Sequence, residues 1–196
     1  MGIKDTAFAS LFDKNDLPYL YRLAEEVRIT HNQDLVNDFN NSCQRKWNDH
    51  NPILDLGNKK IEFLDIMKSL DGDLVVDVGM QRIIDLILGT STNRWARMNV
   101  ATGNAVPAIT DTTLSGGALS VQFSVSGWAE FASTSLRFAG IFGESTATIT
   151  PRESGVYNDL QTVLLNRNMF QNFNFTHTIN VTGFIISNII EFVPVM

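Results

Sequence analysis

The second half of the chain alternates between apolar and polar residues, and this two-residue period restricts it to β-strands with one buried face. In the stretch 119–126, Leu, Val, Phe and Val alternate with Ser, Gln, Ser and Ser. The stretch 173–181 repeats the pattern, with Phe, Phe, His, Ile and Val alternating with Asn and Thr. Because successive strand side chains point to opposite faces, both stretches predict antiparallel strands with a core face and a polar outer face.

Further strand-like stretches follow one another in this half, with glycines between them. They are residues 95–101, 131–142, 145–150, 160–170 and 184–193. About seven short strands with regular turn signals predict an antiparallel β-sandwich for the C-terminal part of the chain.

The first half has the longer period of helices. Asp16, Leu17 and Pro18 form a typical helix start, and apolar residues then recur at helical spacing up to Val27. Residues 32–50 predict a second helix, with an apolar residue at every fourth position. A shorter helical pattern covers residues 59–70.

The clearest helix is expected within residues 69–91, capped by Asp73 and ended by Gly89. The fold class predicted from these patterns is mainly β, with an α-helical N-terminal region and a C-terminal antiparallel β-sandwich.

The charged residues divide the chain in a similar place. No lysine follows Lys68, and after residue 95 only four arginines remain, whereas the first half mixes both signs freely. The charge shift lies near residue 90. We predict two regions: residues 1–74 as a helical arm used for attachment, and residues 75–196 as a helix followed by the β-sandwich domain.

The composition argues against several classes of function. A net charge of −6 is unsuited to a nucleic-acid binder, which needs a basic face. Cys43 is the only cysteine, so no disulfide can form within the chain, and an intracellular protein is expected. The N-terminus lacks the pattern of a secretory signal, and the apolar stretch 184–195 is too short to span a membrane.

The search for catalytic, cofactor-binding or metal-binding residues predicts none. Asp71, Asp73 and Asp77 lack the spacing of a calcium loop, and a turn with a helix cap is the preferred interpretation. His31, Cys43 and His50 do not have the spacing of zinc ligands. The remaining candidates are acids whose separation the sequence does not give: Glu130, Glu144 and Glu153.

The aromatic residues allow two interpretations. Phenylalanine occurs 13 times, against three tyrosines and three tryptophans. These rings could form an ordinary sandwich core, or some could cover a subunit interface, where aromatic residues are enriched and charges depleted. The candidate interface or ligand contacts are Trp95, Trp128, Phe170 and Phe173. An exposed Trp95 or Trp128 could also stack on a sugar, which keeps a carbohydrate- or receptor-binding module open as an alternative.

Four short segments in fixed order resemble a module of tailed-phage structural proteins, found in tail, fibre and baseplate components. The helix with Gly79 ends at Gly89, and a strand then leads to a turn at Ala101, Thr102 and Gly103. The other matching positions are Pro107, Asp111, Thr112 and Leu114, the segment 139–142 (Ala-Gly-Ile-Phe) and the segment 164–170 (Leu-Leu-Asn-Arg-Asn-Met-Phe).

The resemblance covers about residues 75–196, and the first 74 residues lie outside it. It implies a non-enzymatic virion protein, a homo-oligomeric neck, tail or baseplate component whose partners are copies of itself and other virion structural proteins. Capsid decoration is an alternative position in the particle, and a host glycan is a possible further partner. On this interpretation the segment 101–114 shapes a scaffold, with Asp111 and Thr112 bonding to nearby backbone.

Overall fold

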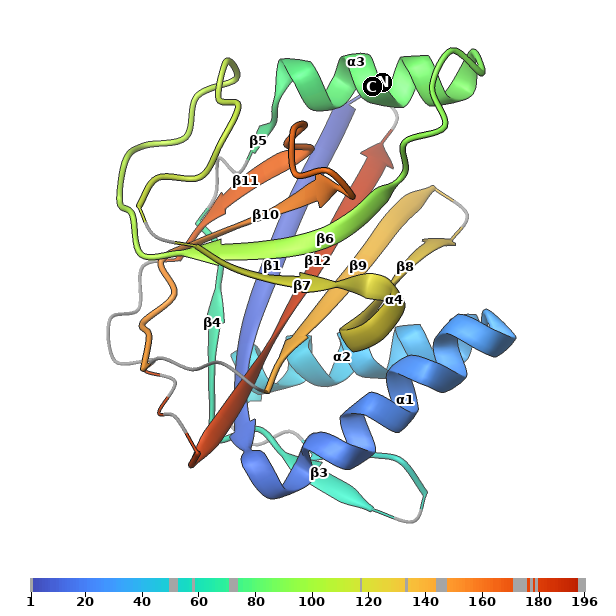
Figure 1. Cartoon of the computed structure of the whole chain (residues 1–196). Helices are drawn as coiled ribbons and strands as arrows, with labels where there is room; N and C mark the ends of the chain where they lie inside the picture. Colours follow the sequence, from blue (N-terminus) through green and yellow to red (C-terminus); the bar gives the residue numbers. More distant parts are fainter. Residues whose placement is uncertain are drawn as a thin grey trace.

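Two five-stranded antiparallel sheets cross face to face, and two helices cover the outer face of the first sheet (Figure 1). The computed structural model describes residues 2–49, 53–57, 59–70, 74–116, 118–132, 134–143, 148–170, 176, 178 and 180–193. This arrangement confirms the predicted class, mainly β with helices in the N-terminal region and an antiparallel sandwich.

The strands of each sheet come from distant parts of the chain. In spatial order, the first sheet contains β4 (Asp65–Lys68), β1 (Gly2–Asp13), β12 (Thr182–Val193), β9 (Ser135–Phe142) and β8 (Gly127–Ala132). The second contains β5 (Leu74–Val75), β11 (Asn166–Met169), β10 (Glu153–Asn158), β6 (Trp95–Ala101) and β7 (Ala118–Gln122). A separate hairpin consists of β2 (Ile53–Asp55) and β3 (Lys60–Glu62).

Helices occupy three places around the sheets. The 3-10 turn η1 (Lys14–Asp16), α1 (Leu17–Thr30) and α2 (Gln33–Asp49) follow β1, α3 (Asp77–Ile87) joins β5 to β6, and the single turn α4 (Phe123–Ser126) joins β7 to β8. In Figure 1, α3 lies at the top of the molecule, and α1, α2 and α4 lie in its lower part.

The strand β1 changes the predicted domain division. It pairs with β12 along its whole length, from Gly2 opposite Val193 to Asp13 opposite Thr182. The first 74 residues therefore contribute β1 and β4 to the same sheet as β8, β9 and β12, and they do not form a separate helical arm.

The pattern of apolar and polar residues does not predict β1, because both faces of this strand are buried. Ala7 and Ala9 face the second sheet, while Phe8 and Phe12 face the helices. A strand covered on both sides has no polar face, so the two-residue alternation that identifies a half-buried strand is missing.

The helices α1 and α2 agree with their predicted positions. Pro18 lies in the first turn of α1, and Leu20, Leu23 and Val27 are buried along one side of the helix. On α2, Phe39 and Cys43 are fully buried. The core side of each helix is thus the side that the apolar spacing indicates.

Two helix predictions require correction. Residues 59–70 form β3 and β4 in place of a short helix, because β4 pairs with β1 and Ile61 packs under α2. The helix α3 begins at Asp77, after Leu74 and Val75 have joined the second sheet. Its N-cap is Val76, without a side-chain cap; Asp73 lies outside the described residues.

Several strand predictions also differ from the structure. The predicted strand 119–126 stops at Gln122, and the turn α4 then places the ring of Phe123 on that of Phe138, with 5.6 Å between ring centres. Arg28 of α1 holds this turn by donating to the carbonyl oxygens of Phe123, Val125 and Gly127, at 3.4, 3.4 and 3.1 Å. Most of the predicted strand 173–181 lies outside the described residues, and Val181 belongs to a turn.

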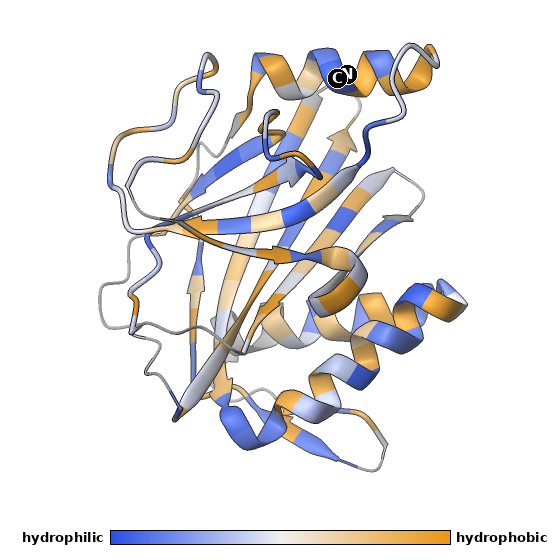
Figure 2. Cartoon of the chain, viewed as in Figure 1, coloured by the Kyte–Doolittle hydropathy of each residue, from blue (hydrophilic) through white to orange (hydrophobic). Residues whose placement is uncertain are grey.

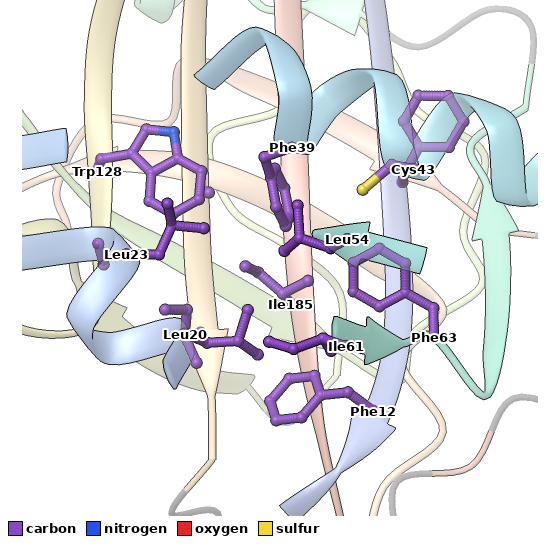
Figure 3. Packing of buried hydrophobic residues seen from close by; sticks show 14 of the residues in the cluster. Phe12, Leu20, Leu23, Phe39, Cys43, Leu54, Ile61, Phe63, Trp128 and Ile185 are labelled. Carbon is purple, nitrogen blue, oxygen red and sulfur yellow. The ribbon is translucent and has the colours of Figure 1, made fainter. Parts of the chain in front are cut away.

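The interior consists of two main apolar clusters on opposite faces of the first sheet (Figure 2). One lies between the sheets and includes Phe138, Phe142 and Phe184. The other lies under α1, α2 and the β2–β3 hairpin, where Phe39 meets Trp128 edge to face with 5.1 Å between ring centres (Figure 3). The first sheet is therefore a shared central layer between the helices and the second sheet.

Candidate functional site

The longest described connection without helix or strand runs from β6 toward β7 through residues 102–116. We call it the β6–β7 connection. It carries two strongly exposed aliphatic side chains, Val106 and Ile109, which expose 83% and 54% of their surface. At its start, the backbone N–H of Gly103 donates to the carbonyl oxygen of Ser115 at 3.1 Å, so the two ends of the connection are joined.

The buried side chain of Arg167, on β11, holds this connection in place. Its Nε donates to Glu153 Oε2 at 2.7 Å, and its Nη1 donates to Asp111 Oδ2 at 2.6 Å. Its Nη2 donates to the carbonyl oxygen of Ala105 at 2.8 Å and to Ser115 Oγ at 3.2 Å. One guanidinium thus binds three positions of the connection and one strand of the second sheet.

The network sets one cation, Arg167, against two carboxylates, Glu153 and Asp111, in a largely buried site. Glu153 is fully buried and Arg167 is 3% exposed, and Ser115 donates its hydroxyl to Glu153 Oε1 at 2.7 Å. Burial opposes ionisation of Asp111, but the N–H of Ala108 and the guanidinium of Arg167 outweigh it and lower the pKa of Asp111. Burial likewise opposes the charge on Arg167, yet its bonds to Asp111 and Glu153 raise the pKa of Arg167.

Two further contacts close the site. Tyr157 accepts a hydrogen bond at its hydroxyl from the N–H of Leu114 at 2.9 Å, and burial raises the pKa of this tyrosine. A Cβ at Gly103 would lie 1.8 Å from Ser115 Oγ and 2.4 Å from Glu153 Oε1, so no side chain fits there without displacing the network. The prediction that Asp111 bonds to local backbone is confirmed, since it accepts from the N–H of Ala108 at 2.8 Å.

Segments that the sequence led us to expect in one module lie against one another. Asp111 meets Arg167 in the network above. Gly79 of α3 packs on Leu165, where an added Cβ would lie 2.3 Å from the carbonyl oxygen of Leu165. A Cβ at Gly140, in the segment 139–142, would lie 2.7 Å from Cβ of Met98 on β6.

A second polar cluster lies between the two sheets. Asp5 of β1 accepts hydrogen bonds from Nδ2 of Asn166 on β11 at 2.7 Å and from Nδ2 of Asn188 on β12 at 2.6 Å. Both asparagines are fully buried. Burial raises the pKa of Asp5 to about 7, although these hydrogen bonds and one from the Thr6 backbone oppose the shift.

The predicted contact residues lie in different parts of the fold. Trp128 is 1% exposed and Phe170 is 2% exposed, each inside an apolar cluster, so neither side chain is on the surface where a partner or a ligand would reach it. Trp95 is partly buried against the cluster between the sheets. Phe173 lies outside the described residues. A sugar cannot stack on Trp128 because α1, α2 and Phe39 already surround its ring.

The acids and histidines singled out from the sequence are also separated. Glu130 binds His31 Nδ1 at 3.0 Å on the surface beside α1, and Glu153 belongs to the Arg167 network. His50 and Glu144 are outside the described residues. Over the described part of the chain, no three His, Cys, Asp or Glu side chains gather closely enough to hold a metal ion.

Two adjoining hollows lie between α1 and α4, with volumes of about 460 and 560 Å³. Tyr21, Val125 and Ser126 line both of them. The first continues along the edge strand β7, and the second along α1 past Arg22 and Arg28. We call the two together the α1–α4 groove. Sequence patterns do not predict this groove, because its walls are distant segments of the chain.

Among the described helices, none has the combination of length and apolar character needed to cross a membrane. Comparisons of the sequence with protein-family models and with curated proteins, and of the fold with solved structures, found no match.

Proposed function

We propose that this chain is a non-enzymatic structural component of a tailed-virus particle, a homo-oligomeric neck, tail or baseplate protein that joins other virion proteins. The observation that supports the proposal is that segments similar to the phage module contact one another in the fold. Asp111 and Arg167, 56 residues apart in the sequence, bond directly, and Gly79 packs on Leu165. Short motifs that matched by chance would have no reason to form one connected unit.

The form of this unit suits a scaffold. A buried arginine fixes a long connection so that Val106 and Ile109 stand exposed on a rigid support. Ordering a surface segment before binding reduces the conformational entropy lost when a partner docks. An exposed connection that is already ordered is therefore suited to permanent assembly with other proteins.

The surface of the second half supports the same use. Cations are sparse there, and several large aliphatic side chains are exposed, including Val125 and Leu160 at 64% and 69%. Interfaces are depleted in charge at their centres, and large exposed apolar patches mark sites of association.

Peptide mass spectrometry and immunogold labelling of purified virus particles encoding this chain test the proposal. We expect the chain in the particles in several copies, labelled at the neck, tail or baseplate. Labelling spread over the capsid would indicate the decoration role instead. Absence from the particles, with the protein abundant in infected cells, would overturn the proposal.

A further inference from the structure

The helix α3 has an apolar side that the rest of the chain does not cover. Ile84, Ile87 and Leu88 expose 44%, 78% and 68% of their surface near its C-terminal end, and we call these three residues the α3 ridge. Gly79 is the only residue of α3 in the buried class. Figure 2 shows hydrophobic colouring along this helix although it lies at the surface.

An 11-residue helix is marginal by itself in water, and packing of its apolar side normally supplies its stability. The chain supplies only part of that packing, through Gly79 and the partly buried Ile83. The exposed ridge therefore calls for a covering surface from another molecule.

The α1–α4 groove has the features of such a surface. Val125 exposes 64% of its side chain there, and Phe142 and Val121 add apolar walls. Arg22 and Arg28 line its second hollow, where Glu25 is the only acid. In a chain with a net charge of −6, this groove is locally basic.

We propose that the α3 ridge of one copy docks into the α1–α4 groove of the next copy. This inference rests on the proposed homo-oligomeric function and names the surfaces that would build the oligomer. The charges agree with it, because α3 carries two acids, Asp77 and Asp85, against one base, Arg82. The groove has the opposite excess, with Arg22 and Arg28 against Glu25. Opposite charges at the contact steer two like-charged copies into one orientation.

The placement of the two surfaces determines the kind of assembly. In Figure 1 the helix α3 lies at the top of the molecule, and α1 and α4 lie in the lower part. A contact between two different surfaces is heterologous, so an open row of copies keeps one free ridge at one end and one free groove at the other until it closes. A closed ring is the expected product.

Thiol cross-linking tests the contact directly. Ile87→Cys places a thiol on the ridge and Ser124→Cys places one in the groove, while the native Cys43 is fully buried. With a short bismaleimide cross-linker, the double variant should give a ladder of linked multimers on a denaturing gel. Each single variant should remain unlinked, because a ridge thiol would not meet another ridge thiol.

The alternatives give different results. Linked dimers from Ile87→Cys alone would show ridge-to-ridge pairing and overturn the inference. No linkage of the double variant, in a protein whose native mass is oligomeric, would also overturn it while the proposed function stands. A native mass that stays monomeric at high concentration would count against the proposed function itself.

A charged substitution gives an independent readout. Ile87→Asp should weaken assembly about tenfold or more, because the carboxylate would be buried in the contact. Ile29→Asp is the matched control, since Ile29 at the end of α1 is 72% exposed and lies outside the groove lining. An equal effect of both substitutions, or no effect of Ile87→Asp, would contradict the docking.

Discussion

Arg167 and Asp111 lie 56 residues apart in the sequence, and their side chains meet at 2.6 Å where the β6–β7 connection crosses β11. The same guanidinium binds Glu153, which is fully buried. The conformation of the connection thus depends on a side chain from another part of the sheet. The β6–β7 connection has no helix or strand of its own, and the ion cluster of Arg167, Asp111 and Glu153 orders it instead.

Removing the guanidinium should destabilise the fold strongly. In Arg167→Met, Glu153 would keep a buried carboxylate without its cation, and a broken buried ion pair costs about 3–5 kcal/mol. Urea denaturation measures the free energy of unfolding. Arg97→Met is the control: it breaks a more exposed contact with Asp159 at 3.6 Å and should cost less than about 1 kcal/mol. Equal losses of unfolding free energy in the two variants would show that the Arg167 cluster stabilises the fold no more than a surface contact does.

A methyl group at Gly79 should separate α3 from the second sheet. An alanine Cβ there would lie 2.3 Å from the carbonyl oxygen of Leu165, so Gly79→Ala should cost about 1–3 kcal/mol despite the better helix propensity of alanine. Gln81→Ala, on the exposed side of the same helix, should change stability by about 0.5 kcal/mol or less. A stabilised Gly79→Ala variant would mean that α3 does not pack closely on Leu165.

The partly buried Asp5 should make stability depend on pH. Because its pKa is raised from 3.8 to about 7, the folded chain keeps a proton that the unfolded chain releases. Its stabilising contribution is therefore fully present below the unfolded value and is lost as the pH rises through 7. Asp5→Asn should remove this slope between pH 4 and pH 7, measured by urea denaturation at each pH.

The control for Asp5 is a surface carboxylate. Asp55 pairs with Lys60 at 3.8 Å and its side chain is 57% exposed, so Asp55→Asn should leave the slope in place. A slope that Asp5→Asn does not change would show that Asp5 ionises as an ordinary aspartate in the folded chain.

The single cysteine should be unreactive in the folded protein. Cys43 is fully buried beside Ser10, and burial raises the pKa of its thiol to about 12. The thiolate is the reactive form, so a thiol reagent should label none of the native protein and one site per chain in denaturant. Rapid labelling of the native protein would show that α2 opens from the sheet. Cys43 would then also react in the cross-linking experiment and would have to be replaced first.

The sequence predicted α1, β6 and the long apolar strand β12, but it missed β1. The helix α1 was recognised from Leu20 to Val27 because its outer side is polar, and β6 was placed at Trp95–Ala101 as observed. The strand β1 was missed because helices cover one face and the second sheet covers the other. Periodicity carries information only where a solvent face contrasts with a core face.

Only those contacts of the candidate site that join residues close in the sequence could be predicted. The bond of Asp111 to the backbone of Ala108 follows from the turn chemistry of neighbouring residues. The pairing of Arg167 with Glu153 follows from the register of β10 and β11, which the sequence does not give. The turn α4 was missed for a similar reason, since Arg28 of a distant helix holds its carbonyl oxygens.

The native mass of the purified protein tests the central claim most directly. If the chain is built to assemble with copies of itself, mass spectrometry under native conditions should give a discrete multiple of the 21.9 kDa chain mass. A folded chain that remains at 21.9 kDa across the accessible concentration range would contradict the claim.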